Sequence, residues 1–327
     1  MLVSGLRKLG MAVVAATAFV IAGSAAQAAP TNVGPEECKD CHSPEYAVWE
    51  KTPHAESYKD IHKRDLADKV TEAVGERSMK RSETCGQCHY TEAPKRAGGR
   101  VGNNFGVSCE SCHGPGSEYI EIHNVYGPKG TKKEDETPLH KAERFAKSRE
   151  AGMRLPRWRD DVPDMPTDVN YDVAANCFNC HGMARDSLEG DTAAKMLAAG
   201  HPLNPGFELV KYSQGQVRHR FYHSTQDNEE MTPAELSRWF VTGQAASLVQ
   251  AANAMQKTQD AKYVAAQEAR AAKAREALGA LDMAEAKALL GQPTEANARA
   301  LIGKIYGEQM DLTGQVGSML PPKSEYK

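Results

Sequence analysis

Residues 106–116 of this chain read Gly-Val-Ser-Cys-Glu-Ser-Cys-His-Gly-Pro-Gly, which places Cys109, Cys112 and His113 in the spacing Cys-x-x-Cys-His. This spacing is typical of a c-type haem attachment site. The two thiols add across the vinyl groups of one porphyrin, and the adjacent histidine binds its iron as the proximal ligand. The stretch therefore predicts one covalently attached haem.

The same pattern occurs four times and uses all eight cysteines of the chain. The other three copies are Cys38, Cys41 and His42; Cys85, Cys88 and His89; and Cys177, Cys180 and His181. Each repeat makes a chance match less plausible. We therefore predict four covalently bound haem c groups, with the motif cysteines as attachment points and the four motif histidines as proximal iron ligands.

Three other uses of paired cysteines fit less well. Zinc knuckles rarely carry a histidine directly after every second cysteine. Disulfides across a two-residue gap occur in redox motifs, but four of them in one chain would be unusual. Iron–sulfur proteins group their cysteines more tightly. Covalent haem attachment remains the preferred interpretation.

The first residues predict a secretory signal peptide over 1–28. Arg7 and Lys8 form a basic start, 11–22 is an uncharged apolar run, and Ala26-Gln27-Ala28 is a cleavage site of small residues. The alternative is an uncleaved anchor, but the apolar run is shorter than the about 20 residues that cross a bilayer. We predict a periplasmic protein with no transmembrane segment after cleavage. Loss of the two cations changes its net charge from -3 to -5 before the haem propionates are counted.

The chain divides by composition into a tetrahaem cytochrome c domain over 29–229 and a C-terminal helical region over 230–327. The first part is interrupted throughout by Pro and Gly, and alternating strand patterns are scarce. We therefore predict a mainly α fold with extensive loops and without a sheet. Short helices are expected at 44–52, 58–74 and 139–151, and an exposed charged loop at 126–136.

The C-terminal region predicts a helical hairpin or a short bundle without haem. Thr232, Pro233 and Glu235 form a capping box with proline at the first helical position. The segment 251–290 is rich in Ala, Glu, Lys and Arg and has no proline, and a further helix is expected at 295–306. Two interpretations stay open. The helices form either a solvated appendage or a surface for a partner or for dimerisation.

The histidines outside the motifs decide what the irons can do. A second imidazole on an iron gives a site that only transfers electrons, whereas a vacant position leaves room for a substrate. Seven of the eleven histidines are available for that role: His54, His62, His123, His140, His201, His219 and His223.

From Cys38 to about His223 the chain resembles the tetrahaem cytochrome c-554 family of ammonia oxidisers. The first motif is followed by Trp49 and by Thr52-Pro53-His54-Ala55, and the segment 109–116 resembles that family's third haem segment. Related haem packing occurs in octahaem hydroxylamine oxidoreductase and pentahaem nitrite reductase. The helical region after residue 230 lies outside the resemblance.

The resemblance also implies a set of second iron ligands. His123 would bind the first haem opposite His42, and His54 would bind the third opposite His113. For the fourth haem, opposite His181, it implies His219, with His223 as the competitor. His62 and His140 lie among charged neighbours and are expected at the surface.

The second haem is where this chain departs from the family, whose second haem has an open sixth position. Here Gly200-His201-Pro202 offers a histidine in a turn-like segment. We predict His201 as the second ligand of the haem attached at Cys85 and Cys88.

These observations predict an exported electron carrier with mostly bis-His haems, and no catalytic residues. The alternative is an enzyme that acts on nitric oxide, nitrite or hydroxylamine at a five-coordinate second haem. A third hypothesis, compatible with the first, is that 230–327 docks the protein into an oligomer or a larger complex. Expected partners are a redox donor and acceptor, one of them by resemblance a nitrogen-cycle oxidoreductase. No basic stripe suggests nucleic-acid binding.

Overall fold

The structure, a computed structural model, describes residues 29–157 and 165–327. The predicted signal peptide lies outside the described residues. The helices are α1 (Pro35–Lys39), α2 (Ser43–Trp49), α3 (Pro53–Asp60), α4 (Asp65–Ala73), α5 (Glu83–His89), α6 (Cys109–His113), α7 (Pro138–Glu150), α8 (Asn170–His181), α9 (Gly190–Ala198), α10 (Leu209–Ser213), α11 (Pro233–Ala254), α12 (Ala261–Gly279), α13 (Ala284–Gly291), α14 (Glu295–Gly307) and α15 (Thr313–Val316). Short 3-10 turns are η1 (Ile61–Lys63), η2 (Met79–Arg81), η3 (Lys133–Asp135), η4 (Gly317–Met319) and η5 (Lys323–Glu325). The prediction of a mainly helical fold is confirmed.

The expectation that no sheet forms was wrong in one place. β1 (Thr91–Pro94) and β2 (Val101–Phe105) pair antiparallel directly after the second motif, with Thr91 opposite Phe105 and Pro94 opposite Val101. Each strand is only four or five residues long. Such a short pair gives little alternating pattern, which explains why the sequence did not reveal it.

The first predicted helices are present, and one of them is divided. The ranges 44–52 and 139–151 correspond to α2 and α7. The range 58–74 is broken at Arg64, whose backbone is extended, and α4 then begins with Asp65. An acidic residue in the first turn interacts favourably with the helix dipole, so Asp65 favours a new helix start at this point.

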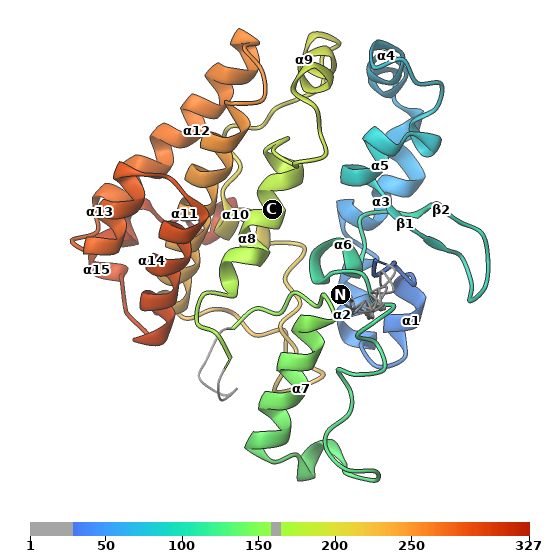
Figure 1. The fold of residues 1–327 in the computed structure, drawn as a ribbon, viewed down its shortest axis with the longest axis vertical. Helices are drawn as coiled ribbons and strands as arrows, with labels where there is room; N and C mark the ends of the chain where they lie inside the picture. The colour runs from blue at the N-terminus through green and yellow to red at the C-terminus, as the bar shows by residue number, and fades with distance from the viewer. Residues whose placement is uncertain (1–28, 158–164) are drawn as a thin grey trace, which may run out of the picture.

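The main core joins α8 to the C-terminal helices. α11 begins at the predicted capping box, which is present, and packs against α8, α10, α12 and α14. Figure 1 shows α8 between the C-terminal helices on one side and the motif helices α5 and α6 on the other. The sequence left two interpretations of the C-terminal region open, a solvated appendage and a surface for a partner or for dimerisation. Neither of them included the packing of α11 against α8, a motif helix of the same chain.

Small residues let these helices approach closely. A Cβ added to Gly243 in α11 would lie 2.7 Å from the side chain of Leu209 in α10. Ala245 and Ala246, two and three residues further along α11, are fully buried. Alanine-rich sequence that looked weakly apolar is therefore used here for close packing.

Replacing Leu248 with Ala should destabilise the protein strongly. Leu248 lies on α11 in the main core and is 0% exposed, so its removal leaves a cavity. We expect a loss of about 2–5 kcal/mol in the free energy of unfolding. Chemical denaturation of the holoprotein measures this, and Leu139→Ala is the control because Leu139 is 65% exposed. Equal losses in both variants would contradict the packing described here.

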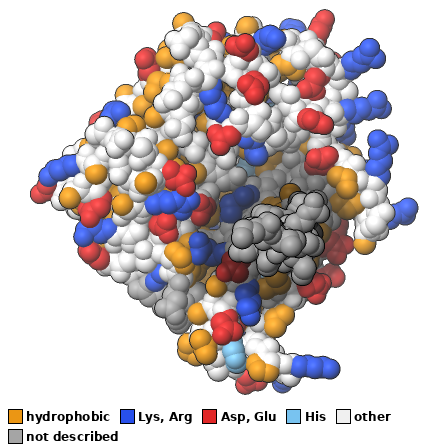
Figure 2. Space-filling model, in the orientation of Figure 1, with side chains coloured by type: hydrophobic (Ala, Val, Ile, Leu, Met, Phe, Trp, Pro, Cys, Tyr) orange, Lys and Arg blue, Asp and Glu red, His pale blue; other side chains and the backbone are white. Residues whose placement is uncertain are grey.

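The surface carries both signs of charge. On the face drawn in Figure 2, acidic and basic side chains are interspersed. Within the described ranges, none of the helices has the length and apolar character that a membrane crossing requires.

Candidate haem sites

Three of the four motifs lie on helices, which explains their spacing. The second motif lies on α5, where the Ser82 hydroxyl accepts a hydrogen bond from the amide of Cys85 (2.8 Å) and caps the helix. The third motif forms α6, and the fourth forms the last turn of α8. Residues three and four apart lie on one face of a helix. The two thiols and the imidazole of each of these motifs therefore start from the same side.

The first motif is the most exposed. Cys38 lies in the last turn of α1, whereas Cys41 and His42 lie between α1 and α2 and are exposed. The Trp49 indole donates a hydrogen bond to the carbonyl of Val107 (2.8 Å), and so joins this region to the third motif. None of the eight cysteines forms a disulfide with another.

The four motifs lie in a continuous row. α1, which carries Cys38, packs against α6 of the third motif, and α5 of the second motif packs against α8 of the fourth. Between these pairs, α6 packs against α8, and the Asn176 side chain donates to the carbonyl of Ser111 (2.8 Å). The spatial order is therefore first, third, fourth, second, which differs from the order in the chain.

Each motif histidine faces one further histidine. The ring centroids are 6.2 Å apart for His42 and His123, 6.0 Å for His89 and His201, 6.0 Å for His181 and His54, and 6.1 Å for His113 and His219. These four histidines are the ones that were predicted from the sequence as second iron ligands. His223, the competitor of His219, lies against Tyr222.

Two of the predicted pairings are exchanged. We expected His54 opposite His113 and His219 opposite His181, whereas His54 faces His181 and His219 faces His113. The packing of the helices explains this exchange. α3, which carries His54, packs against α5, and α5 packs against α8, so His54 lies beside the end of α8. The pairings of His42 with His123 and of His89 with His201 are those expected.

The spacing of the ring pairs fits a metal between them. Metal–imidazole bonds are about 2 Å long, so two rings on opposite sides of one metal have centroids roughly 6 Å apart. This is the separation of all four pairs. The residues present therefore fit axial ligands of haem iron, although the binding of iron by these histidines stays a prediction.

Hydrogen bonds at Nδ1 orient several of these rings. Nδ1 of His113 lies 3.2 Å from the carbonyl of Arg154, that of His201 lies 2.9 Å from the carbonyl of Pro202, and that of His219 lies 2.6 Å from the carbonyl of Val217. Since a carbonyl can only accept, Nδ1 carries the proton. Nε2 is then unprotonated and free to bind a metal.

Burial keeps the innermost motif histidines neutral. It lowers the pKa of His89, His113 and His181 to about 4 in each case, with smaller contributions from neighbouring positive groups. The pKa of His42 is raised, chiefly by the carboxylate of Glu45, which lies 3.8 Å from its Nδ1. A neutral imidazole is the form that binds a metal.

An apolar pocket of about 140 Å³ lies at the second motif. Cys85, His89 and His201 line it together with apolar side chains from α4 and α9, among them Val70 and Met196. An attachment thiol and both facing histidines thus open into the same space. The apolar lining suits a porphyrin ring, whose faces are apolar.

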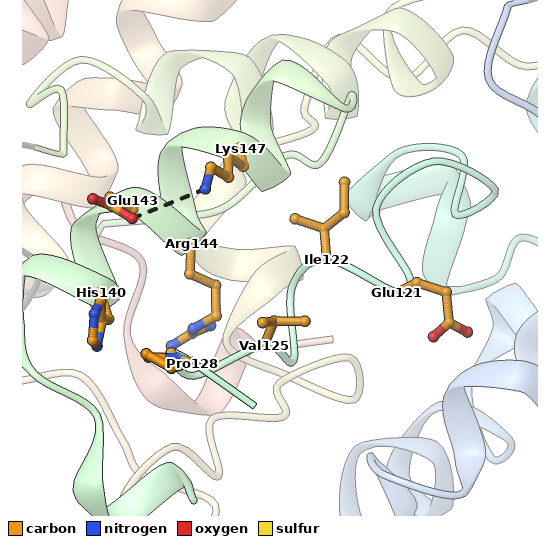
Figure 3. Close-up of a pocket in the computed structure, with 9 residues that line it drawn as sticks. Glu121, Ile122, Val125, Pro128, His140, Glu143, Arg144 and Lys147 are labelled. Carbon is orange, nitrogen blue, oxygen red and sulfur yellow. Dashed lines mark ion pairs between the residues drawn. The ribbon is translucent and has the colours of Figure 1, made fainter. Parts of the chain in front are cut away.

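A second pocket, of about 370 Å³, contains none of the predicted haem-binding residues. It lies between the segment 121–128 and α7, and Figure 3 shows Arg144 pointing from α7 towards that segment. Arg144 pairs with the carboxylate of Glu136 and donates to the carbonyl of His123 (2.8 Å). Its role here is to hold the turn that carries His123.

Sequence reasoning missed several residues that support the motifs. Arg154 donates to the carbonyls of Cys112 (2.8 Å) and Ser111 (3.3 Å), and the buried carboxylate of Glu110 accepts from the amides of Val33, Gly34 and Gly116. Glu110 lies inside the third motif and was visible as a charged residue in it. Arg154 is forty residues from the motif it supports, and nothing in the sequence marked it.

Fold and motifs together define a mainly helical protein with repeated c-type haem attachment sites. Residues 37–114, which carry the first three motifs, match the family described as "Cytochrome c554 and c-prime". The chain is also 29% identical over 133 residues to cytochrome c-554 of Nitrosomonas europaea. The aligned region covers 38% of this chain and 56% of that relative. No solved structure matches the chain.

These matches support the resemblance to the cytochrome c-554 family, and the similarity to the family model extends over the segment with the first three motifs. Similarity to this family supports covalently bound haem c. The chain spans a little over half the length of the relative that it matches. The C-terminal helices lie beyond the residues that match the family.

Proposed function

We propose that this protein is an exported tetrahaem c-type cytochrome that transfers electrons between redox partners through bis-His haems. One observation carries the proposal. Each of the four motif histidines faces one other histidine at 6.0–6.2 Å. Haem iron supplies one-electron chemistry when it is bound. The cysteines attach the haems, and the paired histidines fix the coordination on both sides of each iron.

The row of motifs supports a path through the protein. The packing of α1 against α6 joins the first motif to the third, that of α5 against α8 joins the second to the fourth, and that of α6 against α8 joins the two pairs. An electron that enters at the exposed first motif would therefore leave near the second, or the reverse. Fixed ligands on every site keep the rearrangement at each transfer small.

The second site favours a carrier over an enzyme. Catalysis on nitric oxide, nitrite or hydroxylamine needs a vacant position on one iron. His201 opposite His89 fills that position at the second site. In the family that this chain resembles, the second haem is the one with an open position, and His201 was predicted to occupy it here.

The surroundings of the first motif suggest how a partner is recognised. Glu36, Glu37 and Asp40 are exposed beside Cys41 and His42. Acidic residues around an exposed site steer a partner with a basic surface, and such docking weakens as salt rises. The proposed compartment is the periplasm, in line with the predicted signal peptide, and the proposed donor or acceptor is a nitrogen-cycle oxidoreductase.

Electron paramagnetic resonance of the oxidised protein, together with a pyridine haemochrome count, tests the proposal. We expect four haems per chain and only low-spin signals, because every iron has two imidazole ligands. A high-spin signal from about one haem in four would contradict full bis-His ligation and favour the enzyme. A count below four would contradict the tetrahaem assignment itself.

A further inference from the structure

The C-terminal helices cover the end of the helix that carries the fourth motif. The last carbonyls of a helix lack partners within it and form the negative end of its dipole. Beyond α8, the carbonyl of Gly182 accepts from Gln267 (2.9 Å) and that of Met183 from Tyr263 (2.8 Å). Lys257 donates to the carbonyls of Ala184 and Arg185. Every donor in this set comes from α12 or from the turn before it.

Arg270 of α12 is the most deeply placed member of this set. It is 2% exposed and donates to the carbonyls of His181 (3.2 Å), Gly182 (3.3 Å) and Asn204 (3.2 Å). It also donates to the amide oxygen of Gln267 (2.6 Å). All four acceptors are uncharged. An arginine guanidinium keeps its proton in folded proteins, so Arg270 places a full positive charge at this buried position.

The buried guanidinium of Arg270 affects the relative stability of the two oxidation states of the fourth haem. This guanidinium contacts the backbone of His181, the predicted proximal ligand of the fourth haem. Ferric haem carries one more positive charge than ferrous haem. A fixed positive charge nearby therefore disfavours the ferric form, and the effect is strong where the effective dielectric constant is low. Burial and nearby hydrogen bonds are among the means by which a protein sets haem potentials.

We propose that Arg270 raises the reduction potential of the fourth haem. Through this residue the C-terminal helices would set the potential of a haem that lies between the third and the second in the spatial order of the motifs. The inference rests on the proposed function, because it needs a haem attached at Cys177 and Cys180. It assigns a role to a part of the chain beyond the residues that match the family. A role limited to capping α8 would hold His181 in place without depending on the charge.

Potentiometric titration followed by electron paramagnetic resonance separates these two roles. In Arg270→Gln we expect the potential of one haem to fall by about 59 mV, equivalent to a tenfold change in its one-electron equilibrium. The affected haem should be the one that becomes high-spin in His54→Ala, since His54 faces His181. Arg275→Gln is the matched control, because Arg275 lies on the same helix and is exposed.

Two further variants separate the effect of the charge of Arg270 from the effect of its shape. Arg270→Lys keeps the charge and loses the planar fork, so we expect its potential to stay near that of the natural protein. Gln267→Glu keeps the size of the side chain and places a carboxylate against Arg270, so the potential should fall as in Arg270→Gln. This variant also decides the question if Arg270→Gln does not fold.

The outcomes that overturn the inference are distinct from those that overturn the proposed function. An unchanged fourth potential in Arg270→Gln, or in Gln267→Glu where the first does not fold, would refute the role of the charge. An equal fall in Arg270→Lys and Arg270→Gln would show that only the geometry of the fork matters. Failure of the proposed function appears earlier, in the natural protein, as fewer than four haems or as a high-spin site.

Discussion

Replacing His54 with Ala should convert one haem in four from low-spin to high-spin, and that haem should be the one attached at Cys177 and Cys180. The reason is the 6.0 Å separation between the rings of His54 and His181. Loss of the His54 imidazole leaves the iron with a single protein ligand. His219→Ala should have the same effect on the haem attached at Cys109 and Cys112, because His219 faces His113.

Spectra alone count the high-spin haems, so the site must be mapped chemically. Peroxide attacks an open haem in preference to one with two ligands, and mass spectrometry of the haem peptides then identifies the damaged motif. In His54→Ala we expect damage on the peptide that contains Cys177 and Cys180. Damage on the Cys109 peptide instead would restore the pairing that the family resemblance implied. His140→Ala is the control and should leave the spectrum unchanged.

Replacing His201 with Ala should open the second haem to small ligands. His201 and His89 line the same apolar pocket, and removal of the His201 ring leaves that space beside the iron. We expect carbon monoxide binding to the reduced protein to rise from none to about one molecule per chain. Optical titration with carbon monoxide measures the stoichiometry directly.

The control for this experiment is His62→Ala, since His62 lies in η1 near the same site and faces none of the motif histidines in the ring pairs described above. It should bind no carbon monoxide. If the natural protein already binds one equivalent, the second iron is open and the enzyme becomes the better proposal. If His201→Ala binds none, another group occupies the position assigned to His201.

Much of the site was predictable because covalent attachment depends on short spacing. Cys109, Cys112 and His113 lie close together on one short helix. A stretch of five residues is therefore enough to identify the attachment motif. The start of α11 was predictable for the same reason, since Thr232 and Glu235 form a local capping box. Local interactions need no knowledge of the rest of the fold.

The burial of the C-terminal helices was not predictable from composition. Alanine-rich segments with many charges look suited to solvent, yet α12 packs against α11 and buries Ala271, Ala274 and Ala277. Whether alanine faces water or a neighbouring helix depends on the partner and not on the alanine. The same holds for Arg270, which reads as one more charged residue in such a segment and is 2% exposed in the fold.

The sequence by itself determined the predicted chemistry of this protein, because it contains four Cys-x-x-Cys-His motifs and further histidines that were predicted to face them. Only the tertiary structure decided which histidine faces which motif. His54 and His181 are more than a hundred residues apart in the chain, as are His113 and His219. Their meeting depends on how α3, α5, α6 and α8 pack, and such long-range contacts leave no spacing rule in the sequence.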